Sequence, residues 1–183
     1  MKLLKRTFAF ALIGGALAST AVVGVVSAQS TITSEQAASI RENCSAIKNT
    51  LNQLHVSDAY LRVNRGQLYE SIATKLMDRF NSRLQSNDFD PAEFTTLTKD
   101  YRTTLNDFRA HYQTYEQQLS VALDTDCTKK PTEFYVAVES ARSKRVQVNK
   151  DVTELNSYII KYQDSLSAFY DRYKQVTTGA PVE

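Results

Sequence analysis

The chain has little of what enzymes, sheets and metal sites require. Its 183 residues include no tryptophan, two histidines, two cysteines, three prolines and five glycines. Between Thr33 and Val176 there are only two prolines and one glycine, and the dipeptides that make tight β-hairpins are absent. Long stretches without breakers or hairpin turns are typical of helices, so the sequence predicts an all-α protein.

Residues suited to catalysis are equally scarce. His55 and His111 are the only histidines, and neither belongs to an ExxH pattern. The sequence contains no GxSxG nucleophile motif and no Gly-rich phosphate loop. We therefore expect no catalytic residue, no metal and no cofactor, and we expect the protein not to be an enzyme.

The N-terminus has the pattern of an export signal. Basic residues precede an apolar run over residues 8–26, and small residues lead to Ala28. This pattern predicts a signal peptide at residues 1–28, cleaved after Ala28. The alternative is an N-terminal membrane anchor, because residues 8–26 are close to the length that spans a bilayer. Both alternatives predict that residues 29–183 are exported and work in a periplasm, at a cell surface or outside the cell.

Cleavage would change the charge of the protein. The full chain has 22 basic and 20 acidic residues, and residues 1–28 contain three basic residues and no acidic one. The remaining 155 residues therefore have 19 basic and 20 acidic residues, and a net charge of −1. That balance indicates no overall attraction to nucleic acid, and we expect no nucleic-acid partner. The length predicts one domain.

The two cysteines, Cys44 and Cys127, both follow the export signal. An even number of cysteines in an oxidising compartment favours a disulfide. Without a CxxC spacing or a neighbouring histidine, metal binding by these cysteines is the weaker alternative. We predict one disulfide between Cys44 and Cys127.

The apolar residues recur at alternating intervals of four and three, the heptad pattern of packed helices. Capping signals and prolines divide the chain into helices at about residues 33–86, 91–125 and 131–177. Short connections make successive helices antiparallel. The sequence thus predicts an elongated antiparallel three-helix bundle with coiled-coil-like packing. On the first helix the seam reads Ile40, Cys44, Ile47, Leu51, Leu54, Asp58, Leu61, Arg65, Leu68 and Ile72.

Charges interrupt this seam and its counterpart on the third helix. If the disulfide sets Cys44 level with about residue 131, the offset of 87 residues sets Asp58 level with Arg145. The antiparallel second helix has Tyr112 and Tyr115 at the same level. We therefore predict a buried Asp58–Arg145 ion pair flanked by these tyrosines, as a polar layer that fixes the register of the helices.

One heptad further, Arg65 lies level with Val152, and we predict that it pairs with the neighbouring Asp151 in the same layer. The functional alternative is that this part of the first helix binds a ligand or partner, because polar residues kept on a seam cost stability. The candidate partner-binding residues are Arg62, Arg65, Gln67 and Glu70.

Two short runs, Thr50–His55 (TLNQLH) and Leu61–Glu70 (LRVNRGQLYE), resemble a segment of uncharacterised small exported helical proteins from Saccharibacteria-type bacteria of the candidate phyla radiation. The paired cysteines fit the same resemblance. It implies an exported helical protein, and it implies no activity and no functional residue.

These patterns favour a non-enzymatic exported helical-bundle module that binds a protein partner of unknown identity at the cell surface or in secreted form. Two alternatives share the fold. One is an extracytoplasmic holdase-type chaperone whose helical arms grip unfolded chains at a splayed end between Leu76 and Leu84. The other is a membrane-tethered coiled-coil spacer anchored through residues 8–26.

Overall fold

The computed structural model describes residues 32–178, and every regular element in this range is helical. The signal peptide or anchor predicted at residues 1–28 lies outside the described residues. The elements, in chain order, are α1 (Ser34–Glu42), α2 (Cys44–Ser71), the π-helix η1 (Ile72–Met77), α3 (Asp78–Ser86), α4 (Ala92–Asp124) and α5 (Pro131–Thr178). The prediction of an all-α protein is confirmed for this part of the chain.

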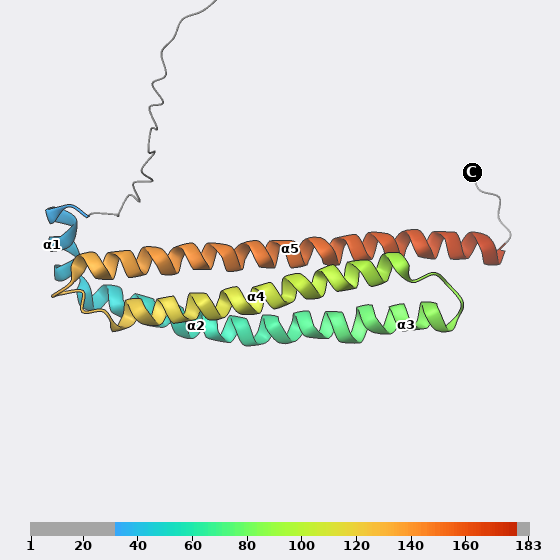
Figure 1. Cartoon of the computed structure of the whole chain (residues 1–183), viewed down its shortest axis with the longest axis horizontal. Helices are drawn as coiled ribbons and strands as arrows, with labels where there is room; N and C mark the ends of the chain where they lie inside the picture. Colours follow the sequence, from blue (N-terminus) through green and yellow to red (C-terminus); the bar gives the residue numbers. More distant parts are fainter. Residues whose placement is uncertain (1–31, 179–183) are drawn as a thin grey trace, which may run out of the picture.

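The helices form a long rod. Figure 1 shows α2 and α3 in one line, with α4 and α5 beside it. We call the continuous run of α2, η1 and α3 the first arm. Helix α4 runs back along the first arm and α5 reverses direction again, because short loops join successive helices at opposite ends of the rod. With 48 residues, α5 is about 70 Å long.

The first helix does not run unbroken from residue 33 as predicted. Thr33 caps α1 with the expected capping box, but the helix ends at Asn43, whose side-chain Nδ2 donates to Ser39 O at 2.9 Å. Because Asn43 departs from helical geometry, α1 turns aside and packs against α5 at one end of the rod (Figure 1). The predicted disulfide begins at the next residue and joins Cys44 to Cys127, with Cα atoms 5.6 Å apart.

The seam predicted for the later part of the first arm is wrong by about one residue. The buried positions there are Tyr69, Ala73, Met77 and Leu84. Leu68, which was expected on the seam, is 56% exposed, and Leu76 is 62% exposed. The π-helix η1 winds more residues into each turn than an α-helix does, and it therefore rotates the faces of the arm between α2 and α3.

The far end of the rod is closed by aromatic side chains and does not splay. Phe80 of α3 makes edge-to-face contacts with Phe94 of α4, and with Tyr162 and Phe169 of α5. Such aromatic pairs stabilise a fold beyond the area that they bury. The splayed end expected between Leu76 and Leu84 is therefore wrong, although Leu76 itself is exposed.

Among residues 32–178, no helix combines the length and the apolar character that are needed to cross a membrane. The long helices carry charged residues throughout.

Candidate functional site

A polar layer crosses the rod at Asp58, 14 residues after Cys44 on α2. The carboxylate of Asp58 accepts from Arg145 Nε at 3.0 Å and Nη2 at 3.2 Å, and from the Tyr115 hydroxyl at 2.8 Å. The first arm, α4 and α5 thus each contribute one residue. The predicted ion pair is present at the predicted offset of 87 residues, but only Asp58 is buried, because the Arg145 side chain is 44% exposed.

Tyrosines flank the ion pair, in different ways. Burial, followed by the hydrogen bond to Asp58 and its charge, raises the pKa of Tyr115. Tyr112 joins the layer through its ring, and the guanidinium of Arg62 lies over it, 5.2 Å from the ring centroid. Burial, and then the negative charges of Glu116 and Asp58, raise the pKa of Tyr112 to about 12, although two neighbouring guanidinium groups lower it.

The pairing predicted between Arg65 and Asp151 is wrong. The buried carboxylate of Asp151 faces α4, where its Oδ2 lies 2.8 Å from His111 Nδ1. Gln147 donates to the other oxygen at 3.4 Å. Arg65 instead lines a pocket of about 160 Å³ formed by residues of α2, α4 and α5. Two residues at the same position along parallel helix axes do not face each other unless both helices are also rotated to bring their side chains together.

The four candidate partner-binding residues lie on two sides of the first arm. Arg62, Gln67 and Glu70 line a shallow groove between α2 and α4, whereas Arg65 lines the pocket described above, which Arg62 also borders. Arg62 also reaches α4, where its Nη1 lies 3.0 Å from Glu116 Oε2. The predicted set therefore does not form one site.

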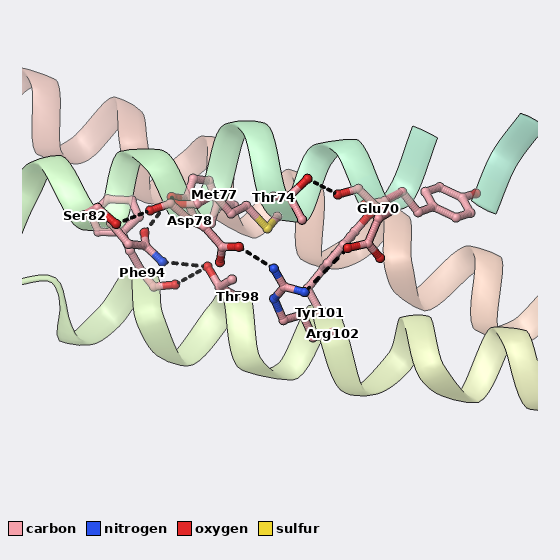
Figure 2. Close-up of polar contacts among 12 residues, drawn as sticks. Glu70, Thr74, Met77, Asp78, Ser82, Phe94, Thr98, Tyr101 and Arg102 are labelled. Carbon is pink, nitrogen blue, oxygen red and sulfur yellow. Dashed lines mark hydrogen bonds and ion pairs between the residues drawn. The ribbon is translucent and has the colours of Figure 1, made fainter. Parts of the chain in front are cut away.

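The acidic residues of the later first arm point toward α4. In Figure 2, Arg102 of α4 lies between Glu70 and Asp78 and forms ion pairs with both. A second α4 residue, Arg109, binds the other oxygen of Glu70 at 2.6 Å. Together with Asp58, these are all the acidic residues between Cys44 and Ser86, so each acid of the first arm has a cationic partner from α4 or α5.

The first arm and α5 are less closely packed together. We call the face between them the open side. Within residues 32–178, α2, η1 and α3 make much closer backbone contact with α4 than with α5. Apolar side chains consequently stay in water: Leu61, Leu68 and Leu76 on the first arm, and Leu166 on α5, are each at least 38% exposed. Leucine is usually buried, and a stripe of exposed apolar residues of this kind is typical of an interaction surface.

A groove of about 560 Å³ lies on the open side, between the π-helix and α5. Its floor consists of Ile72, Leu76 and Phe80 from the first arm, and Ile159 and Leu166 from α5. Neighbouring tyrosines hold the backbone of the arm: Tyr101 OH donates to Tyr69 O at 3.0 Å, and Tyr162 OH lies 3.2 Å from Met77 O. π-Helical segments occur frequently at functional sites.

Cations form one rim of this groove. Lys75, Arg79 and Arg83 follow one another at intervals of four on the first arm, and all three are exposed. Among the described residues, none of them has an ion-pair partner, and the groove is lined by no acidic residue. These residues were not predicted from the sequence, although three like charges at four-residue intervals beside Leu76 were a visible signal.

Within the described range, no cluster of three or more histidine, cysteine, aspartate or glutamate side chains is placed to hold a metal ion. Comparison of the chain with protein-family models, with curated proteins and with solved structures finds no match. The proposed function therefore rests on the exposed apolar residues and the cations of the open side.

Proposed function

We propose that this chain is a non-enzymatic, exported helical protein that binds a protein partner through its open side. The observation that carries the proposal is the apolar stripe there. Leu61, Leu68 and Leu76 recur at intervals of seven and eight residues on the first arm, and all are at least 44% exposed. An apolar face of this length is costly in water, and docking against another protein would bury it.

The proposed scaffold is a three-helix bundle with coiled-coil-like packing, left incomplete on one side. The buried residues of α4 support it, because Tyr101, Leu105, Phe108, Tyr112, Tyr115, Leu119 and Ala122 follow the alternating intervals of four and three. A bundle with an open seam accepts a further helix without rearranging its core.

Export is proposed from two features. The N-terminal segment, which lies outside the described residues, has the composition of a signal peptide or anchor. The Cys44–Cys127 disulfide is compatible with an oxidising compartment. The resemblance to small exported helical proteins of Saccharibacteria-type bacteria agrees with this proposal. Retention of residues 8–26 would make the same bundle a tethered spacer that presents its open side at the membrane surface.

Site-specific photo-cross-linking in the native cells tests the proposed function. A benzophenone amino acid replaces Leu76 in the full chain, and in a matched variant it replaces Val136, which is exposed on α5 and lines none of the grooves described above. We expect one discrete cross-linked protein from position 76 and none from position 136. Equal, unselective cross-linking from both positions, or no cross-link from position 76, would contradict the proposal.

A further inference from the structure

The charges around the groove between η1 and α5 identify the kind of partner that it fits. We infer that the groove binds an amphipathic helix of another protein, whose apolar face lies on Leu76 and Leu166 and whose flanking acidic residues meet Lys75, Arg79 and Arg83. This inference rests on the proposed function and specifies its partner. The partner would lie between the first arm and α5 as an additional helix of the bundle.

The shape and spacing of the groove favour a helix. Its floor is apolar and is formed by two helices that run in the same direction, which is the setting in which bundles seat a neighbouring helix. The exposed apolar residues extend from Leu61 to Leu76 on the first arm, over about 22 Å at 1.5 Å per residue. A partner helix of three to four turns or more would match that length.

The charge distribution selects an acidic partner. All three acidic residues between Cys44 and Ser86 already pair with arginines of α4 or α5. The same stretch contains six basic residues, and Arg62 is the one among them that pairs with a carboxylate of the described chain. Lys75, Arg79 and Arg83 are therefore uncompensated beside an apolar floor. Carboxylates on a docked helix would complement these cations and exclude partners with a basic flank.

The concave floor distinguishes this surface from a membrane-binding one. Leu76 is exposed, but Phe80 and Ile159, which also line the groove, are partly buried between two helices, where a docked helix can reach them and a flat anionic bilayer cannot. A second copy of the chain is disfavoured by charge, because the same basic rim would face itself across a two-fold interface.

The inference is tested by fluorescence anisotropy with three synthetic peptides of about 20 residues, each about 30 Å long when helical. The peptides share one leucine heptad and carry glutamate, glutamine or lysine at the flanking positions. We expect the oxidised full-length protein to bind the glutamate peptide about tenfold more tightly than the glutamine peptide, since three exposed ion pairs each contribute modestly. Binding of the lysine peptide should be weakest, and salt should weaken the preference.

Matched variants locate the binding. The triple variant K75Q/R79Q/R83Q should lose the preference for glutamate over glutamine, and L76E should lose binding of both peptides. The control K129Q/K144Q/K150Q removes the same charge from positions that do not line the groove and should retain the preference. Because all these side chains are exposed, circular dichroism should show an unchanged fold.

Three results would overturn the inference. They are equal affinity for the three peptides, binding to anionic lipid vesicles that exceeds binding to the glutamate peptide, and a dimer in analytical ultracentrifugation that L76E disrupts. A discrete cross-link from position 76 without any preference for the glutamate peptide would remove the inference and leave the proposed function intact. Failure of the cross-link would remove the proposed function itself.

Discussion

Arg145 and Asp58 are joined by two hydrogen bonds across 87 residues of sequence, yet they differ in their access to water. The side chain of Arg145 is 44% exposed, whereas that of Asp58 is 9% exposed. A variant without the arginine leaves a buried carboxylate, and a variant without the aspartate leaves a cation that can reach solvent. The two halves of this ion pair should therefore contribute unequally to stability.

Substitution of Arg145 by methionine should lower the free energy of unfolding by about 3 kcal/mol, because the Asp58 carboxylate then keeps only the Tyr115 hydroxyl as a donor. The variant D58L should cost less, and D58L/R145M should approach wild-type stability because both charges are gone. Urea denaturation of the four proteins measures these differences. A larger loss in D58L than in R145M would contradict the assignment.

Gly66 should stabilise the protein when it is replaced by alanine. A Cβ atom built at this position meets nothing within 4 Å, so neither close packing nor a backbone contact requires glycine there. Glycine in a helix interior costs about 1 kcal/mol relative to alanine. We expect G66A to raise the free energy of unfolding in urea by about that amount, and A110G at an exposed interior position of α4 to lower it similarly. Destabilisation by G66A would show that the glycine has a structural role.

The buried tyrosines should make the protein unfold at alkaline pH. Burial raises the pKa of Tyr101, Tyr115 and Tyr162 well above the ordinary value of 10.0, and raises that of Tyr112 to about 12. Because their pKa values are higher in the folded state, these phenols contribute full stability below about pH 10 and lose it as the pH rises further.

Ultraviolet absorbance of phenolate and circular dichroism, followed together above pH 10, check this expectation. The five buried phenols, Tyr69 among them, should ionise in the same step in which helix is lost, and Y115F should remove one phenol from that step. Ionisation of all the tyrosines at one ordinary pKa while the helices stay intact would contradict it.

The Cys44–Cys127 disulfide, at the α1 end of the rod, should contribute a large part of the free energy of unfolding. In the chain-entropy account, a link that spans 83 residues stabilises the folded state by about 4–5 kcal/mol. We expect C44A/C127A to lose stability of that order relative to the oxidised protein, and the wild-type protein to match the variant after reduction. Equal urea midpoints for oxidised and reduced wild-type protein would exclude this role.

Sequence reasoning located Asp58 and Arg145 correctly because only regular helix separates each of them from the disulfide end. Cys44 and Asp58 belong to one uninterrupted α-helix, so the offset set by the disulfide is preserved over those residues. Positions along the length of the rod were therefore predictable.

Rotation about the helix axes was not predictable in the same way. An α-helix drifts by about 20° per heptad from a strict seven-residue seam, so the buried position has moved from Leu68 to Tyr69 within α2, and the π-helix at Ile72–Met77 then rotates the arm further. The sequence pattern of an apolar residue is the same whether it faces a core or an open groove, and Leu68 was therefore assigned to the seam although it is exposed. The position of Asp151 along α5 predicted a pairing with Arg65, but the rotation of α5 about its axis turns Asp151 toward His111.

The most direct test of the open side is methyl nuclear magnetic resonance of leucine-labelled protein titrated with the glutamate-flanked peptide. Leu76 and Leu166 line the groove, whereas Leu105 and Leu119 are buried in α4. Our account predicts that the methyl signals of Leu76 and Leu166 shift with added peptide while those of Leu105 and Leu119 stay in place. Shifts confined to residues away from the groove, or no shifts at saturating peptide, would contradict it.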